Sequence, residues 1–496
     1  MTQNKEISQK IYDTNEIANM KPEKVLRYFT EITKIPRPSN HEEKIADYLV
    51  SFAKDRNLEY VKDGALNVLI KKKGQGIGAG KKPLLLQGHM DMVCEKMPHV
   101  EIDFEKDPIS IYYENGEIRA EGTTLGADDG VAVAVMLALL DDKEITHPPL
   151  ECLFTSAEET GLDGATTFDM SLISARRMIN MDSEEIDRIV TGCCGGERTD
   201  LVFPMRREAI RARDESLKIS VSGFCGGHSG ENINEGRANA NKVLGRILSA
   251  LYATCPFVLS DIGGGSKDNA IPRDAHAVIV FRDENLGLIT TTAKKLFNEI
   301  KGELKACDAE ATLTMTLEKS PWKWSQPATE RILLFLDSAQ NGVIEMHKDI
   351  PGLVGFSRNM GVIRSEPKTV TVTFSSRSEI PSQLDYSTSQ LSRLAALCNG
   401  EGRSYARYPG WAHENVSELR DMWAKLYKTK TGKEIQQVVI HAGLECGILH
   451  EKCPDMDIIS VGPDMHDVHS PNEGVNVESL ALFWDILLDA LKELSK

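Results

Sequence analysis

Five short segments of this 496-residue sequence carry histidine or acidic side chains of the kinds that bind divalent metals. They are centred on His89, Asp128, Glu159, Asp182 and His469, which together supply two imidazoles and three carboxylates. Zinc and similar ions accept such mixed nitrogen and oxygen ligands. Bound metal lowers the pKa of water to about 7, which makes water a usable nucleophile for an amide bond. The residue types therefore point to metal-assisted hydrolysis.

In two of these segments a neighbouring acidic residue could have a role of its own. Asp91 follows His89 by two positions, and in an extended chain both side chains point to the same side. A carboxylate placed in this way could orient or polarise the imidazole. Glu158 directly precedes Glu159, and two buried glutamates repel one another unless cations lie nearby. Two exposed loop glutamates are the alternative.

Each segment also has an ordinary structural interpretation. His89 could lie in a solvated loop, and Asp128 with Asp129 could cap a helix N-terminus. A single aspartate such as Asp182, or a lone histidine such as His469, is usually structural at a strand end. Their common position favours a site, because each segment follows an expected strand or begins an expected helix. Ligands of open α/β sheets bind at the carboxyl ends of the strands.

The elements that would position these residues alternate between strand and helix patterns in the first part of the chain. The expected strands cover residues 66–71, 84–87, 150–156 and 178–181. The expected helices cover residues 21–35, a segment capped by Ser39 and Glu42, and residues 130–140. The glycine-rich residues 74–80 are expected to form a flexible hairpin loop. The alternation predicts an α/β sheet covered on both faces.

The pattern changes after Gly195-Gly196 and returns from about Ser417. Between them, expected strands cover residues 217–222, 275–282 and 369–375, and expected helices cover 237–252 and 386–398. After Ser417 come a helix to residue 428, strands at 438–441 and 458–461, and a helix at 477–494. We therefore expect an α/β catalytic domain, with a mixed sheet between helices, from residues 1–196 and 411–496. An α+β domain would be inserted over residues 197–410.

Composition excludes several other classes of protein. The net charge of −16 disfavours binding to nucleic acid or to anionic membranes. No stretch reaches the ~20 apolar residues of a membrane helix, and the first ten residues resemble no signal peptide. The ten cysteines are scattered without a disulfide framework, which favours reduced thiols and the cytoplasm.

The order of these segments resembles the M20 metallopeptidases, and within them the bacterial aminoacyl-histidine dipeptidases. The motifs that carry the resemblance are LLLQGHMDMV at 84–93, RAEGTTLGAD at 119–128, NMDSEE at 180–185, GGHSGENI at 226–233, DNAIPRDA at 268–275, HAGLECG at 441–447 and VHSPNE at 468–473. One departure is Asp129, where relatives in this subgroup often carry Asn and tripeptidases of the family carry Asp. This departure affects the substrate assignment and leaves the metal ligands unchanged.

The resemblance implies a zinc-peptidase-like catalytic domain with two metal ions and an inserted lid domain. Asp128 would bridge both ions, His89 and Asp182 would complete one site, and Glu159 and His469 the other. Zinc is the expected metal, and manganese or cobalt would suit the same ligands.

The resemblance also implies catalytic roles for residues outside the ligand set. Asp91 would support His89, and Glu158 would act as general base and acid toward a metal-activated water. His228, in the inserted domain, would stabilise the oxyanion.

The expected activity is hydrolysis of dipeptides, including Xaa-His dipeptides such as β-Ala-His. Asn269 with Arg358 or Arg377 would bind the substrate carboxylate, and Glu445 would lie near the substrate. The alternatives are a tripeptidase, an N-acyl amino acid deacylase, and an inactive metal-binding relative. The expected partner is a small peptide, with a homodimer through the inserted domain as a further expectation.

Overall fold

The computed structural model describes residues 10–304, 306–348, 350–414 and 416–496. It divides into two compact units. The first unit comprises the chain up to Gly192, His413–Val439 and Leu444–Lys496, and the second comprises Cys193–Ala412 and Ile440–Gly443. The chain therefore passes between the units four times, whereas boundaries at 196 and 411 provide for two passages. The additional passages enclose the short segment Ile440–Gly443.

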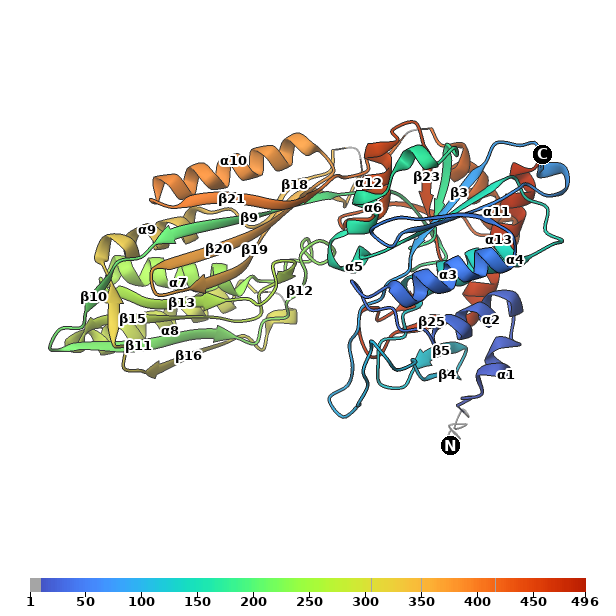
Figure 1. Ribbon diagram of the computed structural model, residues 1–496. Helices are drawn as coiled ribbons and strands as arrows, with labels where there is room; N and C mark the ends of the chain where they lie inside the picture. The colour runs from blue at the N-terminus through green and yellow to red at the C-terminus, as the bar shows by residue number, and fades with distance from the viewer. Residues whose placement is uncertain (1–9, 305, 349, 415) are drawn as a thin grey trace. The chain divides into compact units, whose positions relative to one another are not determined.

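The first unit is built on an eight-stranded mixed sheet in the order β1-β2-β6-β3-β7-β23-β8-β22 (Figure 1). Its strands are β1 (Glu59–Lys62), β2 (Val68–Lys72), β3 (Leu84–His89), β6 (Leu150–Thr155), β7 (Arg177–Asn180), β8 (Arg188–Cys193), β22 (Gln436–Ile440) and β23 (Asp457–Ser460). Strand β3 pairs in parallel with β6 and β7, and β23 pairs in parallel with β7. The carboxyl ends of these central strands therefore meet at one edge, as the sequence predicted.

Helices cover both faces of this sheet. They are α1 (Thr14–Ala18), α2 (Glu23–Ile32), α3 (Glu43–Asp55), α4 (Ala127–Asp141), α5 (Glu158–Gly161), α6 (Asp163–Thr167), α11 (Glu418–Thr431), α12 (Glu445–Lys452) and α13 (Val477–Leu494). Leu84 and Leu86 of β3 join the core formed with α2, α4 and α13. Leu85 points to the opposite face and is also fully buried. Strand β3 thus reads as a continuous apolar run because both of its faces are covered.

Two local predictions for the first unit were wrong. Helix α3 has no capping box, because the Glu42 side chain accepts hydrogen bonds from the amides of Asn40 and Ala157, both at 2.9 Å. Glu42 thereby fixes the turn before Glu158 instead of closing its own helix. The glycine-rich residues 74–80 do form a loop, but not a hairpin, because β6 lies between β2 and β3.

The second unit is an α+β structure with a nine-stranded sheet, in the order β16-β11-β15-β13-β19-β20-β9-β21 with β18 paired to β19 (Figure 1). Its strands are β9 (Gly195–Pro204), β11 (Asp214–Ser222), β13 (Val258–Gly264), β15 (Ala275–Arg282), β16 (Thr312–Leu317), β18 (Gly342–Met346), β19 (Val354–Ser365), β20 (Thr369–Ser378) and β21 (Glu401–Tyr408). Helices α7 (Ala240–Thr254), α8 (Leu286–Lys301), α9 (Gln326–Ser338) and α10 (Pro381–Leu397) share one hydrophobic core with the sheet.

Two small sheets support the loops that carry candidate site residues. Strands β24 (Met465–His466) and β25 (Gly474–Asn476) enclose the His469 loop, and β25 continues onto β5 (Glu117–Ala120) and β4 (Ile111–Glu114). In the second unit, β12 (Gly227–His228) pairs with β14 (Ala270–Ile271). Across the residues that the structure describes, no helix combines the length and the apolar character needed to span a membrane.

Candidate metal centre

The first group of metal-type ligands forms where three elements of the first unit meet. His89 is the last residue of β3, Asp128 lies in the first turn of α4, and Asp182 follows β7. The Nε2 atom of His89 lies 2.9 Å from Asp128 Oδ1 and 3.8 Å from Asp182 Oδ1. One ligand atom from each residue falls within 4.8 Å of the others, which is close enough to surround a single ion.

A second group shares Asp128 with the first. The Nε2 atom of His469 lies 3.1 Å from Asp128 Oδ2 and 3.0 Å from Glu159 Oε1. Ligand atoms of these three residues again lie within 4.8 Å of one another. Asp128 therefore directs one oxygen toward His89 and the other toward His469, which is the geometry of a carboxylate able to bridge two ions.

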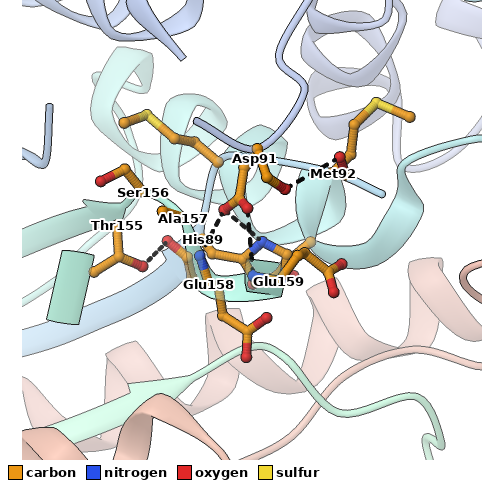
Figure 2. A network of polar contacts seen from close by, with 12 residues as sticks. His89, Asp91, Met92, Thr155, Ser156, Ala157, Glu158 and Glu159 are labelled. Atoms are coloured by element: carbon orange, nitrogen blue, oxygen red, sulfur yellow. Dashed lines mark hydrogen bonds and ion pairs between the residues drawn. The ribbon is translucent and has the colours of Figure 1, made fainter. Parts of the chain in front are cut away.

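Asp91 connects His89 to the pair of glutamates. Its Oδ1 lies 3.3 Å from His89 Nδ1, the nitrogen that faces away from Asp128. Figure 2 shows the same carboxylate beside the backbone amides of Glu158 and Glu159, which donate to it at 3.2 and 3.4 Å. Asp91 thus lies where it can orient the imidazole, and it fixes the position of the turn that carries both glutamates.

The backbone at these positions adopts conformations that local sequence patterns do not specify. Ala157 has a φ of 49° and His469 a φ of 61°, in the left-handed region that residues other than glycine rarely adopt. Such conformations persist where surrounding contacts over-determine them, and they cluster at functional sites. Gly88, next to His89, is required for space, because a Cβ there would overlap Asp129 Oδ2 and the Cβ of Ala132.

The electrostatics of the cluster suit divalent cations. Burial and the nearby charge of Asp129 raise the pKa of Asp182. Burial and the adjacent Glu159 likewise raise the pKa of Glu158, and burial raises that of Glu159. The protein alone therefore stabilises these ionised carboxylates poorly. Cations among them would remove this cost, and the mixture of imidazole and carboxylate ligands fits zinc and related ions.

Comparison with known proteins identifies the family to which this arrangement belongs. Residues 85–493 match the peptidase family M20/M25/M40. The chain belongs to this peptidase family.

Relatives of this M20 peptidase extend over almost the whole chain. The cytosol non-specific dipeptidase of Escherichia coli (strain K12) is 36% identical over 483 residues, which cover 97% of this chain and 99% of the relative. The crystal structure of the aminoacylhistidine dipeptidase from Vibrio alginolyticus superposes with a TM-score of 0.84 at 34% identity, covering 96% of this chain and 98% of that one. The aminopeptidase PepT from Bacillus cereus shares the fold, with a TM-score of 0.56 at 15% identity and coverage of 96% and 99%.

Glu445 of this M20 peptidase is a buried residue of the first unit. It is the first residue of α12, and its side chain is fully buried. Its Oε2 accepts hydrogen bonds from Gln87 Nε2 at 2.5 Å and from Thr155 Oγ1 at 2.6 Å. Its Oε1 has no hydrogen-bond partner within the described residues. Burial raises the pKa of Glu445 to about 7.

His228 and Arg377 meet in the second unit. Arg377 Nη2 lies 3.2 Å from His228 Nε2, and Arg377 Nη1 donates to the hydroxyl of Tyr408 at 3.0 Å. Asn269 lies beside His228, because β12 pairs with β14 and the Asn269 carbonyl accepts a hydrogen bond from the Ser229 amide at 2.8 Å. The structure thus brings together three of the predicted residues of the inserted domain.

Arg358 does not join this group. In the pairing of β19 with β20, Ser357 lies opposite Arg377 and Arg358 opposite Ser376. Neighbouring residues of a strand point to opposite faces, so the two arginines lie on different sides of the sheet. Arg358 donates to Ser387 Oγ at 2.7 Å and to Gln390 on α10, and only 1% of its surface is exposed. Of the two arginines, only Arg377 remains beside His228.

His441 is a buried residue of this region that was not among the predicted site residues. It lies in the segment Ile440–Gly443 of the second unit, and its Nε2 is 2.7 Å from Ser357 Oγ. Burial lowers the pKa of His441 to about 3, assisted by the positive charge of Arg377 and by His228. The HAGLECG motif was the only sequence signal at this position, and it was noted for Glu445.

We expect His441 to make the protein less stable as the pH falls below 6.5, its ordinary pKa. Because its pKa in the folded chain is about 3, only the unfolded state takes up this proton between those values, and stability is lost as the pH falls. Between pH 7.5 and pH 5 the loss is about 2 kcal/mol, at 1.36 kcal/mol per pKa unit. Urea denaturation at both pH values should show a smaller loss in His441→Gln than in the wild type. Equal pH dependence in the two proteins would contradict this expectation.

Proposed function

We propose that this M20 peptidase hydrolyses dipeptides, including Xaa-His dipeptides such as β-Ala-His. The observation that carries the proposal is the position of Asp128 between His89 and His469, with Glu158 in the same cluster. The relatives named as a cytosol non-specific dipeptidase and as an aminoacylhistidine dipeptidase, at 36% and 34% identity, support the choice of dipeptides.

In this proposal the cluster holds two divalent ions, most readily zinc. Asp128 would help to hold both ions, His89 and Asp182 would hold one of them, and Glu159 and His469 would hold the other. When bound, such ions lower the pKa of water and polarise the scissile carbonyl. Asp91 contributes by holding His89 through its Nδ1, so that Nε2 faces the ligand group.

Glu158 is the proposed general base. It is not a member of either group around Asp128, but its carboxylate oxygen lies within 4.8 Å of ligand atoms of His89 and Glu159. The turn that carries it is fixed by the hydrogen bond from its amide to Asp91. Glu158 would take a proton from the attacking water and deliver it to the leaving amine.

We also propose substrate-binding roles for individual residues. Arg377 with Asn269 would bind the C-terminal carboxylate, and His228 would donate a hydrogen bond to the developing oxyanion. Glu445 is the proposed contact for the amino group, because its Oε1 is not used by any described residue. Because Arg358 donates its hydrogen bonds to Ser387 and Gln390, Arg377 is the favoured arginine of this set.

Substitution of Arg377 is expected to affect substrates according to their C-terminus. Arg377→Met should raise KM for a dipeptide about 10–100-fold, because a hydrogen bond to a charged group contributes about 1.5–3 kcal/mol. On a dipeptide amide, which lacks the carboxylate, the variant should be nearly as active as the wild type is on the same amide. Steady-state kinetics on both substrates measures the difference, with the exposed Arg403→Met as control. Equal losses on the two substrates would contradict the proposed role.

One panel of substrates separates the proposed activity from its alternatives. Cleavage of β-Ala-His, Leu-Gly, a tripeptide and an N-acetyl amino acid is measured side by side on the metal-loaded protein. A dipeptidase should cleave the first two fastest. Preference for the tripeptide or for the N-acetyl amino acid would establish a tripeptidase or a deacylase, and no cleavage of any of them would establish an inactive relative.

We also propose a cytoplasmic location and a homodimer formed through the second unit. The name of the Escherichia coli relative supports the former. For the latter, β16 lies at one edge of the nine-stranded sheet and exposes 56% of Leu317, and such an edge can pair with a second copy. Light scattering of the purified protein measures the mass and tests the dimer.

A further inference from the structure

A single buried carboxylate holds the segment that carries Asp128. Glu473 is only 2% exposed, and its Oε2 accepts hydrogen bonds from the amides of Leu125 at 2.7 Å and Gly126 at 3.0 Å. Its Oε1 accepts from the amides of Ala127 at 2.7 Å and Asp128 at 3.3 Å. Four consecutive amides therefore point at one side chain, and a carboxylate with two oxygens is suited to accept all of them.

Arg37 holds the carbonyl side of the same segment. Its Nη2 donates to the carbonyl of Gly126, while its Nη1 donates to the carbonyls of Met90 at 3.1 Å and Asp91 at 3.0 Å. Arg37 thus joins the segment of Asp128 to the end of β3, which carries His89. Gly126 has a φ of 70°, and a Cβ there would lie 2.5 Å from Arg37 Nη2, so the close approach requires glycine.

Glu473 also belongs to the loop of another candidate ligand. It follows His469 by four residues, and the next residue, Gly474, begins β25. The loop is anchored there because Gly474 pairs with Arg119 of β5, and Arg119 donates to the carbonyl of Asn472 at 2.9 Å. Because the loop is anchored, Glu473 is held in place, and its carboxylate in turn holds the backbone of residues 125–128.

We propose that Glu473 is a positioning residue for the metal centre. Its carboxylate fixes the backbone of residues 125–128 and so places the side chain of Asp128 between His89 and His469. The proposal rests on the proposed function, because it takes Asp128 as the ligand shared by two ions. Glu473 belongs to neither ligand group around Asp128, and its effect would be transmitted through Asp128.

Amide hydrogen exchange of the metal-free protein tests this role without catalysis. In Glu473→Gln the amide group of the new side chain presents its own N–H donors to part of the segment. The amides of residues 125–128 should then exchange at least about tenfold faster, the effect of losing hydrogen bonds to a charged group. Glu478→Gln, an exposed substitution on the first turn of α13, is the matched control and should leave these amides unchanged.

Metal affinity gives the second readout. The dissociation constants of both sites, measured by competition with a chromophoric chelator, should rise about 10–100-fold in Glu473→Gln, as for other residues that support metal ligands. Excess metal should restore most of kcat, with KM little changed. A role in stability alone would lower the melting temperature while the folded protein kept its metal affinity.

The outcomes separate this inference from the function on which it rests. Unchanged exchange and unchanged metal affinity in a folded Glu473→Gln variant would overturn the inference while the wild type still hydrolysed dipeptides. A wild-type protein that binds no metal and cleaves no dipeptide would overturn the proposed function. Glu473→Asp, which keeps the charge but shortens the side chain by one methylene, should shift both readouts in the same direction. It decides the question if the glutamine variant does not fold.

Discussion

Glu158→Gln should lower kcat for dipeptide hydrolysis by about 10²–10⁴-fold, the range that a positioned general base contributes. Glutamine has nearly the same size and shape but cannot accept the proton of the attacking water. Because Glu158 is outside both groups around Asp128, the variant should still bind about two ions per chain. Metal analysis together with steady-state kinetics on β-Ala-His measures both quantities.

Two further variants of this protein serve as controls for Glu158→Gln. Glu101→Gln changes an exposed glutamate of the first unit and should leave kcat unchanged. Glu158→Asp keeps a base but withdraws it by one methylene, so its kcat should lie between those of the wild type and Glu158→Gln. Full activity in Glu158→Gln would refute the assigned base. Loss of metal in parallel with activity would identify Glu158 as a ligand instead.

Much of this centre could be predicted because its residues follow strands that are easy to recognise. The apolar run of β3 ends at His89, and that of β6 ends just before the turn that carries Glu158. Because the two strands are parallel neighbours, their carboxyl ends lie side by side. Apolar runs and the positions where they end are local features of the sequence, so they could place these two segments at the same edge. The long apolar helix after Asp128 was likewise visible, since every position from 130 to 140 is buried.

Contacts between distant segments could not be predicted in this way. Glu473 reaches the amide of Leu125 across 348 residues, and no local pattern links the two positions. Glu42 shows the opposite error, because a local capping pattern with Ser39 was present but the side chain bonds to Ala157 instead. In both cases a buried amide near a candidate ligand requires an acceptor, and the fold supplies that acceptor from another element.

The choice between the two arginines depended on strand register. Arg358 lies on β19 and Arg377 on β20, and both side chains are almost fully buried. Only the pairing of Ser357 with Arg377 shows that their side chains lie on opposite faces. A shift of one residue in either strand would exchange them, so the sequence alone left both candidates open.

Protonation of the ligands is expected to make metal binding, and with it activity, strongly pH-dependent. Burial lowers the pKa of His469, but hydrogen bonds to Asp128 and Glu159 outweigh this effect and raise it to about 11 in the metal-free protein. An ion must therefore displace a proton from the imidazole to bind, and protons compete with metal as the pH falls. Metal titrations at several pH values should show affinity rising with pH, and an affinity independent of pH would contradict this view of the site.

Asp128→Asn should remove more metal and more activity than substitution of any other single ligand. The carboxylate is the only group common to both ligand groups among the described residues, and asparagine offers one oxygen where aspartate offers two. We expect the metal content to fall from about two ions per chain to below one, and hydrolysis to fall at least about 100-fold, beyond the effect of losing a supporting residue. Elemental analysis after dialysis, with Asp485→Asn as the exposed control, measures the first quantity.

Chelation of the wild type should abolish activity, and re-addition of metal should restore it in the wild type but not in Asp128→Asn. A variant that retained two tightly bound ions would show that the two groups are independent sites and that Asp128 does not join them.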